Sequence, residues 1–154
     1  MEYLIIKWLH ILSAILLFGT GLGSAFYKLF TDLSGNLEAI SVTNRLVVRA
    51  DWIFTTPTVV IQPVTGFWML SLAGMSLEQT WLWVSIGLYL LAGACWLPVV
   101  VLQIKMRNQA DNCRKQAQPL PESYYKQLKI WVALGIPAFL AMVAVTALMV
   151  LKPV

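Results

Sequence analysis

The stretch WLHILSAILLFGTGLGSAFY, residues 8–27, decides the fold class, because its twenty residues include no charged side chain. A helix needs about 20 mostly apolar residues to cross a hydrocarbon core about 30 Å thick. Three further uncharged stretches follow, at 52–77, 79–104 and 130–151. Four stretches of this length predict four membrane-spanning helices.

Composition supports the same fold class. Hydrophobic residues make up 59% of the 154 residues and charged residues 12%, with a mean hydropathy of +0.74. Soluble domains average about 25% charged residues, so this chain has too few charges to cover a surface that faces water. The first stretch is too long for a signal peptide and lacks a convincing cleavage site, so we expect it to be retained. We predict an all-α, four-transmembrane-helix bundle in a single integral membrane domain over residues 1–154, with spans at about 4–27, 52–74, 81–104 and 130–151.

The basic residues predict an orientation. Nine of the eleven Lys and Arg residues lie in the segments 28–51 and 105–129. Positive charge is concentrated on the cytoplasmic side of multi-pass proteins. These segments are therefore predicted to be cytoplasmic loops, with both termini on the non-cytoplasmic side of a bacterial inner (plasma) membrane. The net charge of +4 then follows from topology and contact with anionic headgroups, and it does not indicate a nucleic-acid partner.

The first span carries a stripe of small and polar residues at helical spacing. Such a stripe should face protein, because lipid offers polar groups no hydrogen-bond partner. Gly19 and Gly23 form a GxxxG pair, which lets a neighbouring helix approach closely. The stripe consists of His10, Ser13, Thr20, Gly21 and Ser24.

The second span carries a longer polar stripe, interrupted by prolines. Pro57 and Pro63 each remove a backbone hydrogen bond and should kink the helix, and threonine hydroxyls can bond the carbonyls that the kinks free. Gln62, near the middle of the span, should bond to another helix. The stripe consists of Asp51, Thr55, Thr58, Gln62 and Thr65.

His10 is the only histidine of the chain and lies inside the first predicted span. Ionisable groups within a membrane are rare and often functional, and imidazole is a common axial ligand of haem. The alternative is a neutral imidazole that only hydrogen-bonds a neighbouring helix. Counting from the membrane centre places Thr65 and Gly66 near the depth of His10, which predicts a cavity between the outer halves of the first two spans.

Short motifs in all four spans carry a resemblance. The chain resembles a bacterial family of small, uncharacterised integral membrane proteins and, more distantly, is similar to the small membrane-bound, haem-containing protoporphyrinogen oxidases. The matching pieces are Lys7-Trp8-Leu9-His10, Thr56-Pro57, Gly66-Phe67-Trp68, Trp81-Leu82 and Lys152-Pro153.

The oxidase resemblance implies that His10 is a haem ligand. The oxidase pattern also has a histidine and a lysine at the positions of Trp83 and Ser85. This chain therefore lacks the second imidazole and the cation. The resemblance still implies haem binding through His10 alone.

Three classes of function follow. The first is a haem b-binding or redox-linked membrane protein with His10 as axial ligand. The haem iron would be the only metal that His10 binds. A porphyrin or quinone would occupy a cavity lined by Gln62, Thr65 and Gly66. The second is a non-enzymatic scaffold or accessory subunit, which pairs with another membrane protein or a second copy of itself. A small transporter is less favoured, because intramembrane charge is sparse and no inverted repeat is visible. The sequence shows no catalytic set of nucleophile, base and acid, and the catalytic residues remain unassigned.

Overall fold

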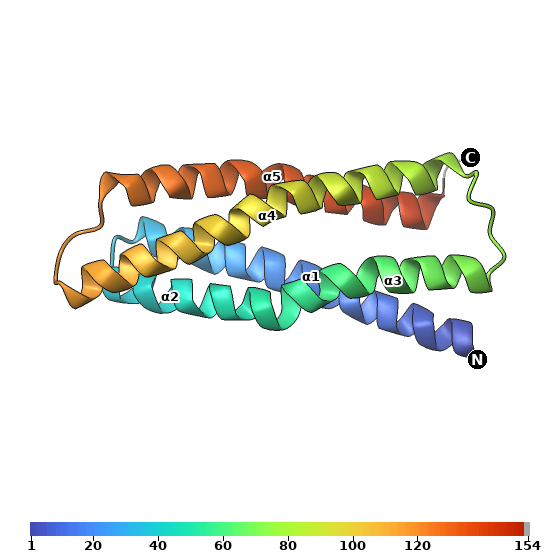
Figure 1. Ribbon diagram of the computed structural model, residues 1–154, viewed down its shortest axis with the longest axis horizontal. Coiled ribbons are helices and arrows are strands. Elements are labelled where there is room, and N and C mark those ends of the chain that lie inside the picture. The colour runs from blue at the N-terminus through green and yellow to red at the C-terminus, as the bar shows by residue number, and fades with distance from the viewer. Residues whose placement is uncertain (153–154) are drawn as a thin grey trace. The chain divides into compact units, whose positions relative to one another are not determined.

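The computed structural model describes residues 1–152, and no strand occurs among them. The chain divides into two compact units, Met1–Ser76 and a second that begins at Leu77. Figure 1 shows each unit as an antiparallel helical hairpin.

The first unit pairs one long helix with an interrupted one. Helix α1 spans Glu2–Leu33. After a short turn, α2 (Leu37–Ala50), the π-helix η1 (Asp51–Thr55) and α3 (Thr56–Leu72) follow without a break in the helical path. Gly35 allows the turn by adopting a φ of +68°, which a residue with a side chain rarely takes up. The side chain of Asn36 then accepts a hydrogen bond from the backbone N–H of Ala39, at 3.1 Å, and caps α2.

The π-helix ends at Thr55, two residues before Pro57. Proline lacks the N–H that would continue the α-helical ladder, and single π turns occur where that ladder is broken. The hydroxyl of Thr58 donates to the carbonyls of Phe54 and Thr55, both at 2.8 Å. The carbonyl four residues before Pro57 belongs to Ile53, so the bonding of the freed carbonyls by threonine hydroxyls stays a prediction. The helix is distorted before Pro57 in the form of a π turn.

The second unit pairs α4 (Thr80–Lys115) with α5 (Glu122–Leu151). Ser85, Ala92, Val99 and Met106 are buried on α4 and recur every seven residues. A seven-residue repeat keeps one side of a helix facing its partner at the small crossing angle common in membrane bundles.

Four helical segments are long and apolar enough to cross a bilayer: Glu2–Leu33, Leu37–Leu72, Thr80–Lys115 and Glu122–Leu151. The prediction of an all-α protein with four such helices is confirmed. The segments predicted as loops, 28–51 and 105–129, are helical apart from the turns at 34–36 and 116–121. The side on which the termini lie, and the assembly of both units into one bundle and one domain, stay predictions.

The first unit is polar inside and apolar outside. Its stripe on the second span is buried, with Thr58 3% and Gln62 8% exposed, whereas Trp8, Leu22 and Val60 are each more than half exposed. Water-soluble proteins bury their large apolar side chains, while a lipid-facing surface is itself apolar. This distribution is the one expected of helices that sit in a bilayer.

The GxxxG pair lies on an open face of α1. A Cβ atom added at Gly19 or at Gly23 would meet no described atom within 4 Å. The hairpin is joined by polar contacts of other α1 residues, His10 and Lys28.

Candidate functional site

His10 lies on α1 and faces α3 near Gln62 and Thr65. Its Nδ1 atom is 2.7 Å from the hydroxyl oxygen of Thr65. Its backbone carbonyl accepts a hydrogen bond from Nε2 of Gln62, at 3.0 Å. Both contacts cross from one helix to the other, so the prediction that Gln62 bonds to a neighbouring helix is confirmed.

Gly66 lies against the imidazole ring. A Cβ atom at this position would be 3.5 Å from Cε1 of His10, and no other described atom outside the helix's own backbone would lie within 4 Å. The ring therefore approaches the backbone of α3 at the point where no side chain stands. All four residues predicted for the site, His10, Gln62, Thr65 and Gly66, meet in the structure.

The two ring nitrogens of His10 differ in their surroundings. Nδ1 is held by Thr65, while no described residue forms a hydrogen bond with Nε2. The side chain as a whole is half-buried. A histidine held through one nitrogen keeps the other available to a ligand in a fixed direction.

Ser13 lies one turn further along α1. Its side chain is 4% exposed, and its hydroxyl has no hydrogen-bond partner among the described residues. Several hydroxyls in these helices bond to a backbone carbonyl of the preceding turn, as those of Thr65 and Ser85 do. Ser13 is thus a buried polar group close in sequence to His10 that takes no part in the contacts with α3.

The described residues contain no group of three or more His, Cys, Asp or Glu side chains that could hold a metal ion. His10 alone can supply one bond to a metal whose other ligands come with the cofactor, as the four nitrogens of a porphyrin do. The predicted roles of the four site residues in haem binding, and the predicted cavity, stay predictions.

The positions that depart from the oxidase pattern lie at the start of α4. Ser85 is 2% exposed and donates to the carbonyl of Trp81 at 2.7 Å. The indole of Trp83, 61% exposed, donates to the carbonyl of Leu77 at 2.8 Å. Neither side chain supplies the imidazole or the cation of the oxidase pattern.

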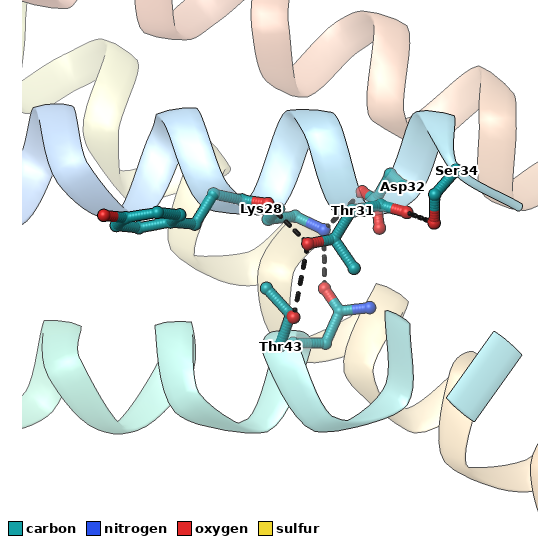
Figure 2. A network of polar contacts seen from close by, with 7 residues as sticks. Lys28, Thr31, Asp32, Ser34 and Thr43 are labelled. Atoms are coloured by element: carbon teal, nitrogen blue, oxygen red, sulfur yellow. Dashed lines mark hydrogen bonds and ion pairs between the residues drawn. The ribbon is translucent and has the colours of Figure 1, made fainter. Parts of the chain in front are cut away.

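A second polar cluster lies near the other end of α1 (Figure 2). Nζ of Lys28 bonds Oδ2 of Asp32 at 2.8 Å and Oδ1 of Asn44, on α2, at 2.5 Å. Lys28 is fully buried, and Asp32 and Asn44 are each 1% exposed. The cluster ties α1 to α2 just as the His10 contacts tie α1 to α3.

Hydroxyl groups extend this cluster. In Figure 2, Thr31 lies between the two helices, and its hydroxyl donates to the carbonyl of Tyr27 at 2.7 Å. The hydroxyl of Thr43 donates to the hydroxyl of Thr31 at 3.5 Å. From the sequence, 28–51 is predicted as a cytoplasmic loop, and this cluster is not predicted. The signal was present in the opposite charges of Lys28 and Asp32, which are four residues apart and so adjacent on a helix.

Comparison with known proteins gives one result. Neither the curated proteins nor the solved structures contain a match, so the similarity to the protoporphyrinogen oxidases stays a prediction. A family model described as "Predicted integral membrane protein (DUF2269)" matches residues 4–153, of which residue 153 lies outside the described residues. This match covers all four spans and nearly the whole chain. The chain therefore belongs to the DUF2269 family of predicted integral membrane proteins.

Proposed function

We propose that this multi-pass membrane protein binds haem b, with Nε2 of His10 as one axial ligand, and serves a haem-binding or redox-linked role. The observation that carries the proposal is the asymmetry of the imidazole, whose Nδ1 is tied to Thr65 while Nε2 is not engaged by any described residue. Histidines that bind metals almost always have their second nitrogen held in this way by an oxygen atom.

The residues present fit one axial position. Imidazole is a usual axial ligand of haem iron. Gln62 and Thr65 fix the backbone and the ring of His10, so the direction of the Nε2 lone pair is set before a ligand arrives. A bound haem would supply one-electron exchange at a potential set by its axial ligand and surroundings.

A non-enzymatic scaffold or accessory subunit is the second candidate. It is favoured by the observation that both hydrogen bonds of His10 join α1 to α3, so they can serve as structural contacts between helices. In that case the protein would act through another membrane protein or a second copy of itself.

The proposal includes the setting of the protein. We propose a bacterial inner membrane, with both termini outside and the basic segments at the anionic cytoplasmic headgroups. Nine of the eleven Lys and Arg residues lie in 28–51 and 105–129, which supports this orientation.

The deciding experiment is a visible spectrum of the purified protein in detergent, oxidised and dithionite-reduced, after expression with a haem supply. We expect a Soret band in the wild type and none in His10→Ala. His10→Asn is the matched control, because an amide can still donate to Thr65 but offers no imidazole to iron. It should lose the band and keep the stability of the wild type.

Two outcomes would contradict the haem proposal. A well-folded wild-type protein without a Soret band would leave the scaffold as the better account. A Soret band retained by His10→Ala would remove His10 from the ligand set.

A further inference from the structure

We infer that Thr65 is a positioning residue, which fixes the neutral His10 ring in the tautomer with its proton on Nδ1. The unprotonated Nε2 then offers a lone pair and no hydrogen. The tautomer follows from the contacts alone, and only its consequence for the ligand depends on the proposed function.

The assignment follows from the single proton of the Thr65 hydroxyl. The hydroxyl oxygen lies 2.6 Å from the carbonyl oxygen of Ile61 and 3.3 Å from that of Gln62. A distance of 2.6 Å between two oxygens is typical of an O–H···O hydrogen bond and would be repulsive without a proton between them. The carbonyl of Ile61 cannot donate, so the hydroxyl proton must point to it.

With its proton committed, the Thr65 oxygen can only accept from His10. Nδ1 of His10 is 2.7 Å away, which is a hydrogen-bond distance. The proton of this bond must therefore come from Nδ1. A neutral imidazole carries one N–H, so Nε2 is left as the acceptor.

The packing around the ring holds this arrangement in place. Gln62 ties the backbone carbonyl of His10 to α3 at 3.0 Å, and the ring lies against Gly66. Nδ1 is the ring nitrogen that lies beside Thr65. The hydrogen bonds thus form a directed chain from His10 through Thr65 to the carbonyl of Ile61.

The tautomer decides between the two ligand chemistries that the sequence leaves open. A quinone carbonyl is a hydrogen-bond acceptor and would need a donor, which Nε2 does not provide in this tautomer. A haem iron needs a lone pair, which Nε2 does provide. The geometry therefore points to a metal centre of a porphyrin as the occupant, and not to a quinone.

The chain makes the test direct, because it contains a single histidine. Protein labelled with ¹⁵N-histidine gives one pair of imidazole nitrogen signals, and couplings to the two ring carbon-bound protons identify each nitrogen. In haem-free wild-type protein we expect the proton on Nδ1. Thr65→Ser keeps the hydroxyl and should give the same result, whereas Thr65→Val should move the proton to Nε2.

A wild-type protein with the proton on Nε2 would overturn the inference. So would a Thr65→Val protein with the proton still on Nδ1. Thr65→Ser is the control for misfolding. It changes the same position but keeps the hydroxyl, so its His10 proton should lie on Nδ1 as in the wild type. Neither result depends on haem.

A parallel haem titration separates this inference from the proposed function. Changing an outer residue that holds a ligating histidine typically costs about 10- to 100-fold in metal affinity. We expect a loss of that size for Thr65→Val and little loss for Thr65→Ser. If wild-type protein has the Nδ1 proton but binds no haem, the proposed function is wrong and the tautomer assignment stands.

Discussion

The buried ion pair of Lys28 and Asp32 offers a sharp test of how much polar contacts stabilise the first hairpin. Lys28→Met keeps most of the side-chain length and removes the charge. The substitution deletes a bond of 2.8 Å to Asp32 and one of 2.5 Å to Asn44, both of which are 1% exposed. It therefore leaves the charge of Asp32 and the amide of Asn44 buried without their Lys28 contact.

The expected magnitude follows from burial. Removing one partner of a buried ion pair typically lowers the free energy of unfolding by about 3–5 kcal/mol, because the remaining charge stays away from water. The chain carries a matched control in the exposed pair of Glu122 and Lys126, also four residues apart and joined at 3.1 Å, with side chains 82% and 70% exposed. For Lys126→Met we expect a change below about 1 kcal/mol.

The assay is equilibrium unfolding in mixed micelles with increasing sodium dodecyl sulfate. The seven tryptophans provide a fluorescence signal. Lys28→Met should unfold at a clearly lower detergent fraction, and Lys126→Met should follow the wild type. If both variants fall within about 1 kcal/mol of the wild type, burial does not set the strength of this contact and the reasoning is refuted.

Three further predictions follow from the same structure. Gln62→Leu removes one hydrogen bond between helices and should lower the free energy of unfolding by about 0.6 kcal/mol, with about 1.7 kcal/mol as the upper end for such bonds. The same unfolding assay measures this loss. A loss above that range would show that Gln62 stabilises the hairpin by more than one such bond. Gly66→Ala should fold normally because its Cβ would sit 3.5 Å from the His10 ring, whereas Gly66→Leu should displace the ring; the ¹⁵N signals of His10 should change only in the second variant. Cys113 lies in the segment predicted to be cytoplasmic, so an impermeant maleimide should label it in inverted membrane vesicles and not in intact cells. Labelling in intact cells would show that the predicted orientation is wrong.

Hydropathy was sufficient to predict the four spans, because a run of 20 or more uncharged residues has few uses outside a bilayer. Spacing was sufficient to predict that polar residues of the first two spans face each other. A polar group in lipid must find a hydrogen-bond partner in the protein. For His10 and Gln62, the facing helix was the expected source of that partner. These two arguments place the candidate site to within one helical turn.

The ends of the helices and the second cluster could not be predicted in the same way. Lys28 and Asp32 looked like the charged end of a span, since charge normally marks the membrane boundary. Their burial depends on α2 folding back alongside α1, which is a contact between residues distant in sequence. The GxxxG pair shows the limit of such motifs, because small residues permit a close approach but do not require one.

The length of the helices has a consequence for how the protein meets its surroundings. With a rise of 1.5 Å per residue, the 36 residues of α4 extend about 54 Å, well beyond a hydrocarbon core of about 30 Å. The fourteen residues of α2 alone account for about 21 Å. Each hairpin must therefore tilt strongly or extend out of the lipid as a rigid stalk. A stalk holds ordered helix in the water phase at a fixed distance from the membrane. A soluble molecule could reach that helix without entering the bilayer.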